Sequence, residues 1–190
     1  MSELEILLGM TEKQRDIYFL RMAFQVAKNF SQDENTQTGA IIVDSNFNIT
    51  SFGSNRANYG DPRRYEGRGN KIIFERPDKY SVLLHAERDA HFVANRLGKS
   101  VVGCTLYTTW NPCKECSEVT VNNGIKRYVT HDACTKWYFE ANKNVKNRLN
   151  WEDSIKKALD IFKRSIVDYI CLSEPIGGVE ILFDDKLRKP

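Results

Sequence analysis

Apolar residues recur at helical spacing over residues 11–30, and a strand pattern follows directly. Thr11 and Gln14 form a capping box at the start of the helical pattern, which predicts an amphipathic helix beginning after Thr11. The stretch "TGAIIVDSNFNITSFGSN" then places a polar turn, Asp44 to Asn48, between two apolar runs. Because this arrangement is typical of a β-hairpin, the sequence predicts a helix followed by two paired strands.

Helix and strand patterns alternate through the rest of the chain. "HAERDAHFVANRLG" and "CKECSEVTVNNG" have helical spacing and end at Gly98 and Gly124, as helices commonly do. "GCTLYTTW" and "IKRYVTH" predict strands before and after the second of these helices. "NWEDSIKKALDIFKRS", with Asn150 as its cap, and "VEILFD" predict a helix and a short strand within residues 150–184. Helical crossovers between strands predict one α/β sandwich domain over residues 1–190.

The composition indicates where in the cell the protein is expected. The chain is 41% hydrophobic and 28% charged, which is typical of soluble globular proteins, and no apolar run approaches the roughly 20 residues of a membrane span. The start "MSELEILLGM" lacks the basic stretch of a secretory signal. Five cysteines, an odd number, suit reduced thiols better than a disulfide framework. We therefore expect a cytoplasmic protein without a membrane partner.

The charge distribution points to one segment. The net charge of +3 is small, which argues against binding a nucleic acid over a broad basic face. Basic residues nevertheless gather between Arg56 and Lys79, in a stretch with few apolar residues that also contains Arg63, Arg64, Arg68, Lys71 and Arg76. The pattern leaves two interpretations open: a solvated loop, or a surface that binds phosphate.

Four residues in two predicted helices carry the candidate chemistry. Cys113 and Cys116 lie in the first turn of one helix, where free N–H groups and the helix dipole favour thiolates. His85 begins the other helix and supplies a third zinc ligand if the two helix starts meet at one sheet edge. Glu87 points about 200° away from His85 around the helix axis, which suits a proton shuttle rather than a ligand. Zinc-activated water with such a carboxylate suits hydrolytic deamination of an amidine-like carbon.

Each of these motifs also has a structural interpretation. Cys-x-x-Cys alone occurs in structural zinc sites and in redox pairs, and Cys104 or Cys134 could complete a structural site. A single histidine at a helix start is often a cap or a core residue. The joint pattern favours catalysis, because His-x-Glu followed by Pro-Cys-x-x-Cys in a separate element is the combination that zinc deaminases use.

With these motifs the sequence resembles the cytidine and deoxycytidylate deaminase superfamily, from about Phe19 to Tyr128. "TGAIIVD" followed by "GSN" resembles the opening hairpin, and "KYSVLLHAERDA" with "PCKECSEVTVNNGIKRYV" is most similar to deoxycytidylate deaminases. The resemblance implies a three-layer α/β/α sandwich with a mixed central sheet and catalytic motifs over residues 38–131. It also implies a homo-oligomer.

The resemblance further implies the roles of individual residues. His85, Cys113 and Cys116 are implied zinc ligands and Glu87 the implied proton shuttle. Asn55 is implied to hold the substrate sugar, and the Ala86 backbone to contact the pyrimidine ring. Where deoxycytidylate deaminases usually have Gly-Tyr-Asn-Gly, this chain has Gly-Ser-Asn-Arg over residues 53–56.

The predicted reaction is deamination of a cytosine nucleotide, dCMP to dUMP with release of ammonia. Arg63, Arg64 and Arg68 are the candidates for holding the phosphate, because guanidinium groups suit phosphate oxygens. The alternatives are a deaminase of another base or nucleoside, a deaminase of cytosine or adenine within a polynucleotide, and a non-catalytic zinc module. An intact Glu87 argues against the last of these.

Overall fold

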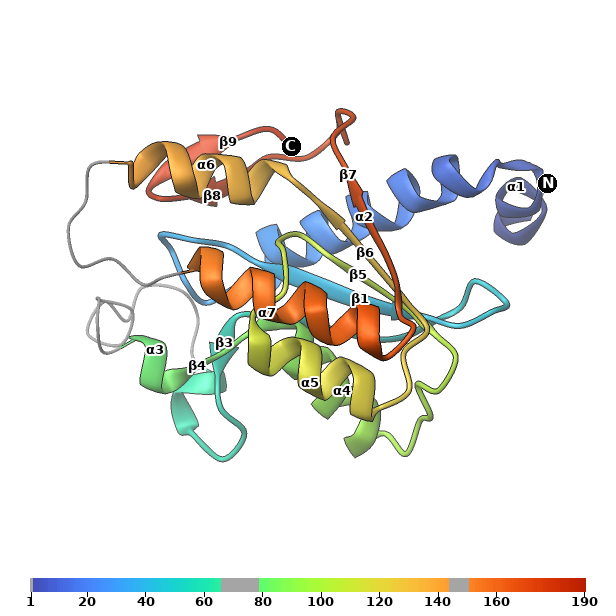
Figure 1. Ribbon diagram of the computed structural model, residues 1–190, viewed down its shortest axis with the longest axis horizontal. Helices are drawn as coiled ribbons and strands as arrows, with labels where there is room; N and C mark the ends of the chain where they lie inside the picture. Colours follow the sequence, from blue (N-terminus) through green and yellow to red (C-terminus); the bar gives the residue numbers. More distant parts are fainter. Residues whose placement is uncertain (1, 66–78, 144–150) are drawn as a thin grey trace.

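The computed structural model describes residues 2–65, 79–143 and 151–190 (Figure 1). Its centre is a five-stranded sheet in the order β2-β1-β5-β6-β7. The strands span Gly39–Val43 (β1), Ile49–Ser54 (β2), Thr105–Thr108 (β5), Arg127–His131 (β6) and Asp168–Leu172 (β7). Strand β1 is antiparallel to β2 and β5, whereas β5, β6 and β7 are parallel to one another. The predicted mixed central sheet is therefore confirmed.

Helices cover both faces of the sheet. Figure 1 shows α2 (Glu12–Phe30) on one face, and α4 (Ala86–Arg96), α5 (Lys114–Asn122) and α7 (Trp151–Arg164) on the other. The side chains of β1 alternate between the two layers, since Ile41 packs with the α2 side and Ile42 with the α4 side. All five residues of β1 are buried, as expected for a strand covered on both faces. The three-layer α/β/α sandwich is confirmed.

The predicted helix starts and stops agree with the structure. Thr11 caps α2 in a capping box with Gln14. Gly98 and Gly124 have φ angles of 65° and 79° just past the ends of α4 and α5, the left-handed conformation that glycine adopts readily. The predicted cap Asn150 lies outside the described residues. Within those residues, no helix combines the length and apolar character that a membrane crossing needs.

Several elements were not predicted from the sequence. These are α1 (Glu3–Gly9), β3 (Arg56–Ala57), a 3-10 turn (η1, Pro62–Tyr65), α3 (Lys79–Val82), β4 (Leu83–Leu84), α6 (Ala133–Ala141), the strand β7, and the partner of the predicted late strand. The late strand is β8 (Ile181–Phe183), and it pairs with β9 (Lys186–Arg188) in a hairpin. This hairpin docks on residues 35–37, through an isolated bridge between Thr36 and Phe183 and a bond from the Gln37 N–H to the Leu182 carbonyl of 2.8 Å.

Candidate active site

Two helices begin at the same sheet edge and carry the predicted ligands. His85 is the N-cap of α4, directly after β4, and Cys113 is the N-cap of α5, a few residues after β5. The Cys113 sulfur accepts a hydrogen bond of 3.4 Å from the backbone N–H of Cys116. The positive ends of two helix dipoles thus meet at this edge, where they stabilise thiolates.

The three predicted ligand atoms converge on one point. His85 Nδ1 lies 3.4 Å from Cys113 Sγ and 3.4 Å from Cys116 Sγ, and all three atoms lie within 4.8 Å of one another. One imidazole and two thiolates suit zinc, and three protein ligands leave a position for water as in catalytic zinc sites. Within the described parts of the chain no fourth His, Cys, Asp or Glu joins this group, so neither Cys104 nor Cys134 completes a structural site.

The Cys113 thiol ionises more readily than the Cys116 thiol, which suits it to bind a cation. Its hydrogen bond with the Cys116 thiol, supported by one with His85, lowers the pKa of Cys113 to about 3, although burial acts the other way. Burial raises the pKa of the Cys116 thiol, so this sulfur ionises when a cation offsets the cost. Binding of a divalent metal should therefore release the proton of the Cys116 thiol.

Glu87 lies beside the ligand group but outside it. Its side chain is buried, lines the pocket described below, and accepts a hydrogen bond of 3.3 Å from the Tyr128 hydroxyl. Burial raises the pKa of the Glu87 carboxyl above its usual range, with the nearby His85 acting in the opposite sense. A carboxyl whose pKa is raised in this way is typical of groups that act in general acid–base catalysis.

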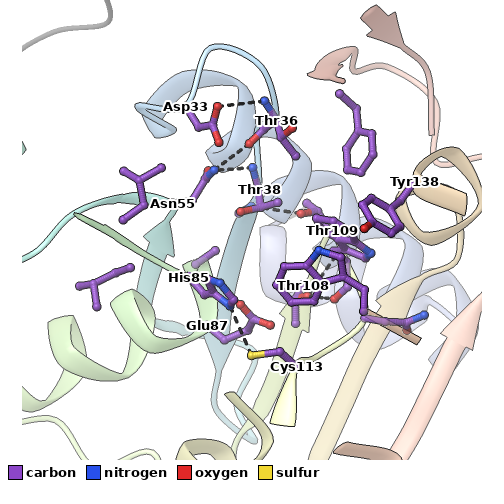
Figure 2. Close-up of a pocket in the computed structure, with 18 of the residues that line it drawn as sticks. Asp33, Thr36, Thr38, Asn55, His85, Glu87, Thr108, Thr109, Cys113 and Tyr138 are labelled. Atoms are coloured by element: carbon purple, nitrogen blue, oxygen red, sulfur yellow. Dashed lines mark hydrogen bonds between the residues drawn. The ribbon is translucent and has the colours of Figure 1, made fainter. Parts of the chain in front are cut away.

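A pocket with an empty volume of about 810 Å³, including space open to solvent, lies over the ligand group. Figure 2 shows His85 and Glu87 at one end of the pocket, and Thr36 and Asn55 at the other. The pocket therefore joins a metal-binding end to a polar end.

Four aromatic rings form one wall of the pocket. The Trp110 ring lies with its centroid 5.6 Å from Tyr138, 5.5 Å from Trp151 and 5.1 Å from Phe183. Trp151 also approaches the imidazole of His85, at 5.7 Å between centroids. All of these residues line the pocket, so a flat heterocycle beside the metal ligands would meet aromatic faces.

Two of the predicted substrate-binding residues line the pocket, namely Asn55 and Ala86. The Asn55 amide also organises the local backbone. Its oxygen accepts hydrogen bonds from the Ser31 hydroxyl (2.6 Å) and the Thr38 N–H (2.9 Å), and its nitrogen donates to the Thr36 carbonyl (2.7 Å). An amide nitrogen has two N–H groups, so Asn55 can offer the second to a ligand.

Arg63 and Arg64, two of the predicted phosphate-binding arginines, form ion pairs outside the pocket lining. Arg63 forms an ion pair with Asp61, and the buried Arg64 forms one with the buried Asp89 on α4. Neither arginine is among the described residues that line the pocket, and Arg68 lies outside the described residues. Their role in phosphate binding stays a prediction.

Sequence reasoning missed most of the polar end and part of the aromatic wall. The lining residues that it did not identify include Asp33, Thr36, Lys79, Tyr138, Trp151, Phe183 and Asp184. Lys79 opens the stretch "KYSVLLHAE", which the family resemblance already singled out, so the sequence contained a sign that it belongs to the site. The C-terminal residues carry no local motif, because only the folded chain brings them to the pocket.

A three-layer sandwich with a His-Cys-Cys group and an adjacent carboxyl at its edge defines the class of zinc-site deaminase-like proteins. The family model described as the cytidine and deoxycytidylate deaminase zinc-binding region matches residues 13–132. The chain belongs to this family.

Curated relatives carry names from the same family. The chain is 33% identical over 141 residues to a probable deoxycytidylate deaminase of Drosophila melanogaster, covering 68% of this chain and 66% of the relative. It is 34% identical over 117 residues to the human deoxycytidylate deaminase, covering 59% of this chain and 61% of the relative. The alignments thus span about two thirds or less of these relatives' length.

Solved structures share the fold at low sequence identity. The dCMP deaminase of cyanophage S-TIM5, in complex with dCMP and dUMP, superposes with a TM-score of 0.56 at 19% identity, covering 86% of this chain and all of that one. A Thermotoga maritima deaminase/reductase gives 0.54 at 18% identity, covering 85% of this chain and 37% of that one. These similarities support the fold.

Proposed function

We propose that the protein is a zinc-dependent deaminase that converts dCMP to dUMP and ammonia. The observation that carries the proposal is the buried Glu87 carboxyl, with its raised pKa, beside the convergent His85, Cys113 and Cys116 ligands. A structural zinc site has no use for such a carboxyl. The names of the curated relatives support the choice of dCMP among cytosine compounds.

His85, Cys113 and Cys116 would hold the zinc, which when bound lowers the pKa of water and so supplies a nucleophile at neutral pH. Glu87 takes a proton from the attacking water and delivers it to ring N3 as the oxygen adds to C4. It then takes the proton of the new C4 hydroxyl and delivers it to the amino group. The C4–N4 bond breaks, ammonia leaves, and the uracil carbonyl remains.

The pocket walls orient the base for these transfers. The ring would lie against the Trp110 face, with the Ala86 backbone at its edge. The Tyr128 hydroxyl donates to the Glu87 carboxyl and is itself buried, which holds Glu87 at the end of the pocket where C4 and N3 must lie. Positioning of the proton carrier is the contribution that this fold makes to the rate.

The 5′-phosphate needs a cation, and Lys79 is the one cationic side chain among the described residues that line the pocket. Its ammonium forms a buried ion pair of 2.7 Å with Asp33. Because an ammonium group carries three N–H donors, Lys79 can contact Asp33 and a phosphate oxygen together. Arg63, Arg64 and Arg68 remain further candidates around this segment.

Ammonia release measured over a panel of substrates tests the proposal. The zinc-loaded protein should turn over dCMP fastest, ahead of deoxycytidine, cytosine, guanine and a single-stranded oligonucleotide containing cytosine. Turnover of the oligonucleotide alone would replace the proposal with polynucleotide deamination. Absence of turnover on every cytosine and guanine compound, with zinc bound, would contradict a catalytic role.

The phosphate contact is tested with paired substitutions. Lys79→Met combined with Asp33→Asn removes both charges of the buried pair and so avoids leaving one of them unpaired. We expect KM for dCMP to rise about ten- to a hundredfold, the loss of one charge-assisted contact, while turnover of deoxycytidine changes little. Equal losses on both substrates would show that the pair serves the shape of the pocket and not the phosphate.

A further inference from the structure

The polar end of the pocket contains a hydroxyl without a partner. Thr36 is 8% exposed, lines the pocket, and its Oγ1 forms no hydrogen bond in the described structure. Figure 2 draws its side chain at the end of the pocket opposite His85 and Glu87. A buried hydroxyl left unpaired lowers stability, so its presence in a ligand pocket suggests that a ligand pairs with it.

The C-terminal hairpin places a carboxylate next to this hydroxyl. Phe183 bridges to Thr36, and the Asp185 N–H donates to the Asn35 carbonyl at 3.1 Å. Asp184, between these two contacts, is half-buried and lines the pocket. Thr36 and Asp184 therefore face the same polar end, although the family model does not extend beyond residue 132.

The backbone of the hairpin turn fixes the position of Asp184. The two-residue turn between β8 and β9 has φ angles of 48° at Asp184 and 59° at Asp185. Such turns favour asparagine, aspartate and glycine, because both central residues have positive φ. Aspartate therefore suits the first position of this turn, and its carboxylate is the group that this position adds to the pocket.

We propose that Thr36 and Asp184 form a subsite for the sugar hydroxyl of the substrate, the 3′-hydroxyl of a deoxynucleotide. The hydroxyl of the sugar donates to the Asp184 carboxylate and accepts from the Thr36 Oγ1–H. Thr36 thereby gains the partner that it lacks, and Asp184, which also accepts a hydrogen bond of 3.5 Å from the Asn142 amide, accepts a further one. This inference rests on the proposed function for the class of ligand. It makes the C-terminal hairpin a determinant of specificity.

Product binding tests the subsite without turnover. Calorimetry of the zinc-loaded protein compares dUMP with 2′,3′-dideoxyuridine monophosphate, which lacks only the 3′-hydroxyl. We expect dUMP to bind about three- to tenfold more tightly for each hydrogen bond made. Thr36→Val and Asp184→Asn should each reduce this preference by about three- to tenfold, mainly by weakening dUMP binding.

Two matched variants serve as controls. Thr130→Val removes another buried hydroxyl without a partner, on β6 and away from the pocket lining, and Asp185→Asn changes the second turn residue. Both should keep the preference for dUMP. Thermal unfolding should show that Thr36→Val and Thr130→Val are at least as stable as the parent, since each removes an unpaired polar group.

The outcomes separate the two proposals. If the parent prefers dUMP and both Thr36→Val and Asp184→Asn retain the full preference, the subsite is wrong and the proposed function stands. If the zinc-loaded parent binds neither nucleotide, the proposed function is wrong and the subsite falls with it.

Discussion

At the scale of single residues, Glu87 separates metal binding from chemistry. Because Glu87 lies outside the ligand group, Glu87→Gln should retain zinc while kcat falls by about 10² to 10⁴, the usual loss for a general acid–base. Elemental analysis and steady-state kinetics on dCMP check both parts. The exposed Glu115 on α5 gives a control, since Glu115→Gln should change neither. Loss of zinc together with the carboxyl would place Glu87 in the ligand shell.

His91 makes stability depend on pH. It is buried, neither ring nitrogen has a partner in the described structure, and burial lowers its pKa to about 4 from an ordinary value of 6.5. The unfolded chain therefore binds a proton between these two values and the folded protein does not. The contribution of His91 to the free energy of unfolding is fully present above pH 6.5. It is lost as the pH drops toward 4, which lowers the free energy of unfolding by up to about 3 kcal/mol.

His91→Leu removes this titration and keeps an apolar side chain in the core. Urea unfolding at pH 7.5 and pH 4.5 measures the effect, and the variant should lose less stability than the parent between the two values. An equal pH dependence in parent and variant would mean that another buried group causes it.

At the scale of elements, the metal site depends on how closely α4 packs on β2. A Cβ atom at Gly53 would clash with the backbone of α4 at Ala86 and Ala90. Ala86 lies between His85 and Glu87 in the sequence. Gly53 therefore sets the position of the helix that carries both groups. The arginine Arg64 reinforces this position through its buried pair with Asp89 on the same helix.

Gly53→Ala should displace α4 at its first turn. We expect the free energy of unfolding to fall by about 1–3 kcal/mol, as in other overpacked sites, and zinc affinity to fall with it. Denaturant unfolding and a competitive zinc chelator measure the two quantities. Gly9→Ala is the control, because a Cβ there meets nothing within 4 Å. Weakened stability with unchanged zinc affinity would contradict the coupling.

At the scale of the whole molecule, zinc should link two helices that begin far apart in the sequence. Its proposed ligands come from the starts of α4 and α5, which pack against each other, so binding should stabilise the folded chain relative to the unfolded one. Removing zinc with a chelator should lower the thermal midpoint, and added zinc should restore it. In Cys116→Ser the midpoint should no longer respond to zinc. An equal response in this variant would point to a different binding site.

Local signals explain what the sequence could predict. The capping box at Thr11 and the glycines after α4 and α5 act within a few residues, and the structure agrees with both. The His-x-Glu and Pro-Cys-x-x-Cys motifs are also local, and the structure brings His85, Cys113 and Cys116 together. Arg64 shows the limit, because its partner Asp89 is 25 residues away and turns an apparent surface cation into a buried one. Trp151, Phe183 and Asp184 reach the pocket through tertiary packing, which no local pattern encodes.

The docking of the C-terminal hairpin also orders the assembly of the pocket in time. Leu182 and Gln37, which pair side chain to backbone, are 145 residues apart in the chain. Closing so long a loop has a large entropic cost, and during synthesis residues 181–185 emerge after both metal-binding helices. A nascent chain can therefore fold α4 and α5 while the pocket still lacks Phe183 and Asp184. The ligand contacts proposed for Thr36 and Asp184 become complete only when the hairpin docks.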